Sequence, residues 1–91
     1  MPFYYVYVLF SERDRKLYIG FTSHVFKRFK QHVNGENIST ENRRPLKLIY
    51  YEAHLNKADA LRRESYFKST SGKRTLQIIL KDVLSELGYL T

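Results

Sequence analysis

The chain has 91 residues, contains no cysteine and carries a formal net charge of +7. This length fits one small domain, and the lack of thiols excludes disulfides, thiolate zinc sites and cysteine nucleophiles, which suits a cytoplasmic protein. The N-terminal "MPFYYVYVLF" is expected to be neither a signal peptide nor a membrane span, because a span needs about 20 apolar residues. The basic balance favours a polyanionic partner, most commonly nucleic acid, although a basic protein without such a partner stays an alternative.

The first two elements are predicted to form a β-hairpin, with strands at residues 3–10 and 16–22 joined by a polar turn. Successive side chains of a strand point to opposite faces. The more apolar face is assigned to the core and consists of Tyr4, Val6, Val8, Phe10, Leu17, Ile19 and Phe21. Tyr7 and Tyr18 then share the other face. Gly20 lies beside Tyr18, which indicates a close approach to the backbone, and we expect that approach to come from a substrate backbone.

A helix is predicted over residues 24–34, with Thr22 or Ser23 as its N-cap. Its buried stripe follows i, i+3, i+4, i+7 spacing and consists of Val25, Phe26, Phe29 and Val33. Arg28 and His32 lie four residues apart on the flank of that stripe. Gly35 is a plausible end of the helix.

The rest of the chain is expected to contain a polar loop, a third strand and two helices, at residues 35–45, 46–53, 57–69 and 73–87. Asn56 can cap the first of these helices, "SGK" should separate the two helices, and Gly88 should end the second. The order ββαβαα predicts one α+β domain over residues 1–91, with a small three-stranded antiparallel sheet and flanking helices.

The helix at 57–69 contains a conflict at Glu64. Its apolar arc is formed by Ala60, Leu61 and Phe67, and Glu64 falls in the middle of that arc. A buried carboxylate is normally paired, protonated or bound to a metal. One interpretation is a salt bridge to Arg28, Arg63 or another basic residue. The other is an oxygen ligand for a divalent cation, because Mg²⁺ is often held by one carboxylate together with waters and phosphate oxygens.

Two short motifs carry a family likeness. "VYV" and "YIG" resemble the two half-motifs of the GIY-YIG nuclease superfamily, with Tyr7 and Tyr18 at the positions of their tyrosines. Arg28 follows Tyr18 by ten residues and His32 follows Arg28 by four, which is similar to the spacing of the family's catalytic helix. Glu64 lies where the family places its metal-binding glutamate.

The resemblance covers a catalytic core at about residues 3–70. The segments "TENRRPLKLIYYE" and "ADALRRE" further resemble the small stand-alone bacterial members. The chain departs from the family at two places. Tyr5 and Val6 replace the glycine and isoleucine of the first half-motif, and no asparagine follows Glu64, whereas many active members have one there.

The resemblance implies the GIY-YIG fold and a Mg²⁺- or Mn²⁺-dependent endonuclease. It would hydrolyse phosphodiester bonds in DNA with low sequence specificity, and one expectation is that it acts on particular DNA structures in repair or recombination. Tyr18 would act as the general base or orient the water, and Arg28 would bind the non-bridging phosphate oxygens. Glu64 would hold the metal, Tyr7 would hydrogen-bond the water or Tyr18, and His32 would contact the phosphate or shuttle a proton.

Five further basic residues are candidates for sequence-independent contacts to the DNA backbone: Lys27, Lys30, Arg43, Arg44 and Lys68. The protein is expected to be a monomer or a weak homodimer. Two alternatives stay open. The first is a catalytically weak or inactive GIY-YIG domain that binds nucleic acid, which the missing asparagine favours. The second is a basic module that docks on an acidic protein, with self-association through the helix at 73–87.

Overall fold

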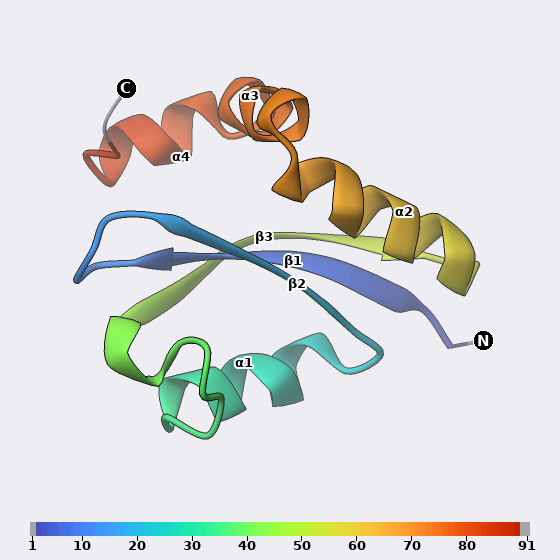
Figure 1. Cartoon of the computed structure of the whole chain (residues 1–91), viewed down its shortest axis with the longest axis horizontal. Coiled ribbons are helices and arrows are strands. Elements are labelled where there is room, and N and C mark those ends of the chain that lie inside the picture. The colour runs from blue at the N-terminus through green and yellow to red at the C-terminus, as the bar shows by residue number, and fades with distance from the viewer. Residues whose placement is uncertain (1, 90–91) are drawn as a thin grey trace.

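The computed structural model describes residues 2–89 and contains one antiparallel sheet with the strand order β2-β1-β3. The strands are β1 (Tyr4–Ser11), β2 (Leu17–Thr22) and β3 (Leu46–His54). Figure 1 shows helices on both faces of this sheet, so the fold has three layers. The predicted α+β fold with a three-stranded antiparallel sheet is therefore confirmed.

One helix covers one face of the sheet and three helices cover the other (Figure 1). The single helix is α1 (Val25–Val33), and the three are α2 (Lys57–Lys68), α3 (Thr70–Ile79) and α4 (Lys81–Glu86). The loop after α1 contains a short 3₁₀ helix, η1 (Glu41–Arg43). With α2 on one side and α1 on the other, side chains from different layers can meet only at an edge of the sheet.

The larger core lies between the sheet and α2, α3 and α4. Its buried residues are Val6, Val8, Ile19, Ala60, Phe67, Leu76, Leu80 and Leu84. Val8 pairs with Ile19 across the hairpin, and Tyr4, Leu17 and Phe21 pack against the same cluster. The apolar strand face predicted from side-chain alternation is therefore the one that faces this core.

A second, smaller core lies under α1. It contains Tyr7, Leu9, Val25 and Leu46, with Tyr18 and Phe29 packed against it. Both faces of the sheet are thus covered, and the face that carries the two motif tyrosines is not an open surface. Covering this face fixes Tyr7 and Tyr18 in place.

The buried face of α1 differs from the predicted stripe. Phe26 is 65% exposed and Val33 is 45% exposed, whereas His32 is fully buried. The row that faces the sheet is Val25, Phe29 and His32, at i, i+4 and i+7. Hydrophobicity alone favoured the valine over the histidine. The histidine can be buried because both of its ring nitrogens have hydrogen-bond partners.

The break between the last helices also differs from the prediction. It falls at Ser69, whose side chain accepts a hydrogen bond from the Gly72 amide, and α3 begins at Thr70. Gly72 lies inside α3, where a Cβ atom would be 1.7 Å from the Tyr66 carbonyl oxygen. This glycine therefore allows α3 to approach the end of α2. The single helix predicted at 73–87 is two helices, because Leu80 leaves helical geometry with φ −106° and ψ 24°.

Other predicted helix ends are confirmed. The Asn56 side chain accepts hydrogen bonds from the amides of Ala58 and Asp59 at the start of α2. Gly35 and Gly88 have φ values of +76° and +69°, which is the left-handed conformation that ends α1 and α4. Thr22 and Ser23 do not cap α1, because its N-cap position is His24. Across residues 2–89, no helix combines the length and the apolarity needed to cross a bilayer.

Candidate nuclease site

The site is built around the ring of Tyr7, which lies across Gly20 on the edge strand β2. The two residues are directly paired in the hairpin register. A Cβ atom on Gly20 would lie 2.3 Å from both Cζ and the hydroxyl oxygen of Tyr7. The close approach predicted at Gly20 is therefore real, but the group that approaches is the Tyr7 ring. The expectation of a substrate backbone at this glycine is wrong.

Tyr7 belongs to a buried hydrogen-bonded chain. Its hydroxyl lies 2.8 Å from Nε2 of His32, and Nδ1 of His32 lies 2.6 Å from the Thr40 hydroxyl. None of the three residues exposes more than 1% of its surface. Of the two roles expected for His32, direct phosphate contact does not fit this burial, whereas a relay through Tyr7 does.

Tyr18 lies between this chain and the solvent. Its ring centroid is 6.3 Å from that of Tyr7 and 5.2 Å from that of His32. Tyr18 is half-buried, whereas Tyr7 is 1% exposed. Of the two motif tyrosines, Tyr18 is therefore the one that a substrate can reach.

The pKa of Tyr7 is raised above its usual range, chiefly because burial disfavours the phenolate. The Tyr18 hydroxyl beside it and the Glu64 carboxylate also raise this pKa, and the Arg28 guanidinium opposes them. Tyr7 is consequently protonated at neutral pH. Tyr18, Arg28 and Glu64 therefore all influence the charge state of this one hydroxyl.

The pKa of His32 is lowered, first by burial and then by the Arg28 guanidinium. The imidazole is therefore neutral at pH 7, with one ring nitrogen as donor and the other as acceptor. If Nε2 accepts a hydrogen bond from the Tyr7 hydroxyl, Nδ1–H donates one to the Thr40 hydroxyl. Both ring nitrogens of His32 then have a hydrogen-bond partner. Throughout residues 2–89, no buried side-chain nitrogen or oxygen lacks a hydrogen-bond partner.

Glu64 reaches the site from α2, in the opposite layer from α1. Its side chain is 18% exposed, and one carboxylate oxygen lies 3.2 Å from Nζ of Lys68, one turn along the helix. The salt bridge predicted as one interpretation therefore exists, with Lys68 as the partner. Leu61, predicted in the same apolar arc, is 39% exposed, because α2 turns Ala60 and Phe67 toward the core.

The donor set fits a hydrated hard cation better than zinc. Within the described part of the chain, no group of three or more histidine, aspartate or glutamate side chains could hold a metal. Glu64 supplies one carboxylate, and Mg²⁺ is commonly held by one or two carboxylates with several waters. Mn²⁺ accepts the same oxygen ligands. Glu64 is the residue that would hold such an ion.

The residues predicted to contact the DNA backbone are placed unevenly around this site. Lys68 contacts Glu64, and Lys27 lines a hollow together with Arg28. Lys30 is exposed on α1. Arg43 is engaged at 2.5 Å by Asp14, and Arg44 donates to the Glu41 carbonyl at 3.0 Å. The last two residues are held by the protein itself and so are weaker candidates for phosphate contacts.

Sequence reasoning missed one residue of the site, Thr40, and one contact within it, between Lys68 and Glu64. Thr40 lies in a polar loop and has no motif that could have marked it. Lys68 was named only as a phosphate contact, although its i, i+4 spacing from Glu64 was a usable signal for an ion pair.

Comparison with known proteins identifies the family of this chain. The sequence model of a protein family, the GIY-YIG catalytic domain, matches residues 3–77. The chain belongs to the GIY-YIG family. It is 40% identical over 86 residues to a UPF0213 protein of Clostridium perfringens, covering 93% of this chain and 91% of that protein. It is also 44% identical over 71 residues to a UPF0213 protein of Bacillus licheniformis, covering 77% and 72%. No solved structure matches the chain at a significant level.

Membership of the GIY-YIG family points to nuclease activity, and a nuclease domain implies binding to nucleic acid. In this GIY-YIG domain Tyr7 and Tyr18, the tyrosines of the two half-motifs, lie on paired strands. The predicted family is thereby confirmed.

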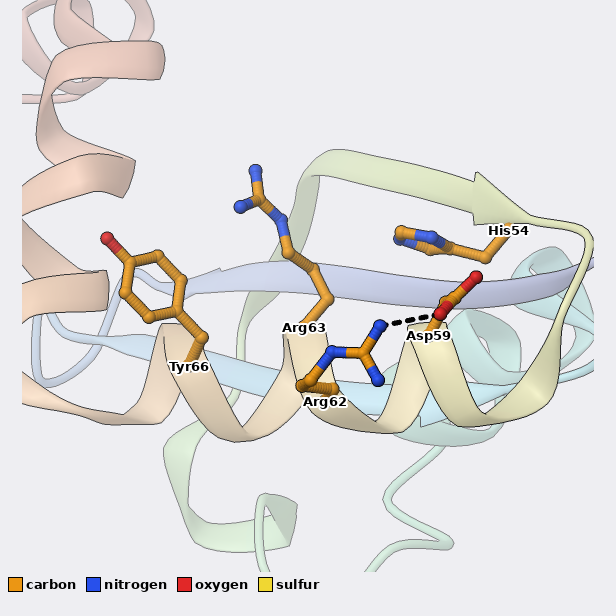
Figure 2. Close-up of a pocket in the computed structure, with 5 residues that line it drawn as sticks. All are labelled: His54, Asp59, Arg62, Arg63 and Tyr66. Carbon is orange, nitrogen blue, oxygen red and sulfur yellow. Dashed lines mark hydrogen bonds and ion pairs between the residues drawn. The ribbon is translucent and has the colours of Figure 1, made fainter.

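A second polar cluster of the GIY-YIG domain lies by β3, the other edge strand, next to α2. A hollow of about 620 Å³ lies there and is lined by His54, Asp59, Arg62, Arg63 and Tyr66. Figure 2 shows these five side chains. Arg62 is paired with Asp59 at 2.6 Å, and Arg63 makes two hydrogen bonds to Glu52 at 2.9 and 3.0 Å. The Arg63–Glu52 contact ties α2 to β3, whereas the Arg62–Asp59 pair lies within α2. Because both arginines have carboxylate partners, this cluster is a structural feature.

Proposed function

We propose that this GIY-YIG domain is a Mg²⁺- or Mn²⁺-dependent endonuclease that hydrolyses phosphodiester bonds in DNA. The observation that supports the proposal best is the convergence of four elements at one edge of the sheet. Tyr7 from β1, Tyr18 from β2 and His32 from α1 lie against one another, and Arg28 from α1 and Glu64 from α2 both influence the pKa of Tyr7. Such a set contains a proton acceptor, an anion-binding group and a metal ligand, which are the parts that phosphodiester hydrolysis needs.

Tyr18 is the residue proposed to activate the attacking water. A tyrosine has a reference pKa near 10, so its proton needs a destination at neutral pH. The Tyr7 oxygen can accept that proton while its own proton passes to Nε2 of His32, 2.8 Å away. A proton of the water then goes to the Tyr18 oxygen, and the water oxygen bonds to phosphorus as the bond between phosphorus and the leaving oxygen breaks. The leaving oxygen takes a proton from solvent.

Arg28 and Glu64 are proposed to act on the phosphate. The planar Arg28 guanidinium binds two non-bridging oxygens, where negative charge grows in the transition state. Glu64 holds the divalent cation, which when bound supplies Lewis-acid stabilisation of the phosphate. Lys68, which pairs with Glu64 at 3.2 Å, would release the carboxylate and turn toward the DNA backbone.

Low sequence specificity follows from the kind of contacts that the site offers. Lys27 and Arg28 are suited to phosphate oxygens, and such contacts position DNA without reading its bases. A role on particular DNA structures in repair or recombination is therefore more consistent with this site than recognition of one sequence.

The second candidate is a GIY-YIG domain that binds nucleic acid with weak or no catalysis. The observation that favours it is the lack of any asparagine after Glu64. Both candidates use the same surface, so they differ only in whether bound DNA is cut.

The test is cleavage of labelled duplex, branched and single-stranded DNA in Mg²⁺, Mn²⁺ or EDTA. We expect metal-dependent cleavage that falls by at least about 100-fold in Tyr18→Phe and Glu64→Gln, because each removes a group that acts in the transition state. Tyr66→Phe and Glu86→Gln are matched controls on exposed positions of α2 and α4, and should cut normally. Cleavage unchanged in both site variants would refute the mechanism, and metal-independent binding without cleavage would support the second candidate.

A further inference from the structure

Three aromatic residues form a cluster where α1 begins, and two of them are exposed. Phe26 is 65% exposed and Tyr51 is 42% exposed, and their ring centroids lie 5.7 Å apart at 82°. Tyr5 contacts the other side of Tyr51, with centroids 5.8 Å apart at 67°. We call Tyr5, Phe26 and Tyr51 the aromatic platform. Phe26 and Tyr51 are grouped rather than scattered singly, and a contiguous exposed aromatic patch points to a binding surface.

The platform is continuous with the proposed active site. A hollow of about 300 Å³ is lined by the platform together with Ser23, His24, Val25 and Lys27. A neighbouring hollow of about 140 Å³ is lined by Thr22, Ser23, His24, Lys27, Arg28 and Gln31. The two hollows share Ser23, His24 and Lys27, so an extended ligand can run from Phe26 and Tyr51 past Lys27 to Arg28.

The cations along this path are available to an anionic ligand. Among residues 2–89, neither Lys27 nor Arg28 forms an ion pair with a carboxylate, whereas Arg43, Lys47, Arg62, Arg63 and Lys68 all do. A basic groove that leads onto exposed aromatic rings is the surface chemistry that binds single-stranded nucleic acid. Phosphates follow the cations, and unpaired bases stack on the rings.

We propose that the platform binds unpaired bases of the DNA next to the phosphate that is cut, so that the substrate is a single-stranded segment or a structure that contains one. The proposal rests on the proposed nuclease function for the position of the cut phosphate. Bases inside a duplex are covered on both faces by their neighbours, so only unpaired bases can use Phe26 and Tyr51 as a stacking surface.

The charges beside the platform argue against a second copy of the chain as its occupant. In a symmetric dimer the same patch faces itself. Lys27 and Arg28 of one copy would then lie close to those of the other, and this repulsion has no compensating carboxylate among the residues that line the two hollows. A polyanion removes that repulsion.

The test is the affinity for a fluorescein-labelled single-stranded dT₁₂ oligonucleotide, measured by anisotropy in EDTA so that no cleavage occurs. We expect Phe26→Ala and Tyr51→Ala each to weaken binding by about 5- to 150-fold, the range for loss of one base–aromatic stack. Phe26→Tyr, which keeps the ring, should bind within about twofold of the wild type. Val33→Ala is the matched control, because Val33 is an apolar residue of the same helix with 45% exposure.

An abasic oligonucleotide with the same number of phosphates separates stacking from charge. It should bind the wild type at least as weakly as dT₁₂ binds Phe26→Ala, and Phe26→Ala should not weaken binding of the abasic strand further. Additive losses, equal weakening of blunt duplex by Phe26→Ala, or no dT₁₂ binding by the wild type would overturn the proposal. So would sedimentation showing that Phe26→Ala dissociates a dimer while dT₁₂ affinity stays unchanged.

Failure of this inference is distinguishable from failure of the nuclease proposal. Binding in EDTA does not depend on catalysis, and cleavage in Mg²⁺ does not require Phe26. If the platform variants bind dT₁₂ normally while the wild type cuts DNA, only the platform is refuted. If the platform behaves as expected and no DNA is cut, only the nuclease is refuted.

Discussion

Gly20→Ala is expected to destabilise the protein by displacing Tyr7. The added Cβ atom would lie 2.3 Å from Cζ and the hydroxyl oxygen of Tyr7 and 2.7 Å from its Cε1. These distances are far inside van der Waals contact, so the ring must move. The ring has nowhere to go at low cost, because Tyr7 is 1% exposed and its hydroxyl is hydrogen-bonded to the buried His32.

Two effects set the size of the destabilisation by Gly20→Ala. Forcing extra volume into a packed core costs about 1–3 kcal/mol. Loss of the hydrogen bond leaves a buried polar atom of His32 without a partner, which costs a further ~1–3 kcal/mol. The backbone of Gly20 does not require glycine, since the positive φ values among glycines of residues 2–89 are those of Gly35 and Gly88. We therefore expect a loss of about 2–5 kcal/mol in the free energy of unfolding.

The assay is urea unfolding followed by circular dichroism, with the same substitution made in two backgrounds. In Tyr7→Leu the ring atoms that clash with the new Cβ are absent. There Gly20→Ala should be neutral or stabilise by up to about 1 kcal/mol, because alanine restricts the unfolded chain. Gly72→Ala is a contrasting control: its Cβ would meet the Tyr66 carbonyl, a backbone atom, so the Tyr7→Leu background should not relieve its cost.

An equal cost of Gly20→Ala in both backgrounds would refute this account of Gly20. It would mean that the alanine disturbs the β2 backbone itself. In DNA cleavage assays the same variant should lose activity even at temperatures where it remains folded, because the Tyr7–His32 hydrogen bond is broken.

Two further predictions concern pH and an ion pair. The folded-state pKa of His32 lies below its unfolded value of about 6.5, so its contribution to stability is fully present above pH 6.5 and is lost as pH falls toward the folded pKa. His32→Gln should make the free energy of unfolding depend less on pH in that window, and an unchanged slope would contradict the burial argument. Asp14 and Glu52, whose pKa values are also lowered, act only at more acidic pH. Arg63→Lys should cost about 1–2 kcal/mol, because lysine loses the two-bond contact to Glu52 and the stacking of the guanidinium over Phe67 at 4.3 Å. The neighbouring Arg62→Lys, at a 73% exposed side chain, should cost less than about 0.5 kcal/mol in the same urea titration, and equal costs would show that the Arg63 geometry is not stabilising.

Local sequence patterns were sufficient for much of the fold. Alternation in "YYVYVLF" and "KLYIGFT" placed Tyr7 and Tyr18 on one strand face, because a period of two leaves no other choice once the apolar set is buried. Asn56, Gly35 and Gly88 marked helix ends through hydrogen-bond and backbone preferences that act over a few residues. The half-motifs and the spacing of Arg28, His32 and Glu64 were enough to predict the family.

Tertiary structure decided which side chains of α1 are buried and which atoms lie next to Gly20 and Gly72. Helical periodicity favoured Val33 over His32 for the buried side of α1. A local pattern contains no information on Tyr7 and Thr40, which lie outside α1 and form hydrogen bonds to both imidazole nitrogens. Gly20 and Gly72 looked like a substrate gap and a helix break, but their neighbours are the Tyr7 ring and the Tyr66 carbonyl.

The sequence by itself determined which residue types the site contains and which strand face carries its tyrosines. Only the tertiary structure brought Arg28 and Glu64, from helices on opposite faces of the sheet, close enough to influence the same Tyr7 hydroxyl, and only it left Phe26 exposed. The physical reason is the range of the interactions. Strand alternation and helix capping act between neighbours in the chain, whereas the pKa of Tyr7, the burial of His32 and the exposure of Phe26 depend on contacts between residues far apart in sequence.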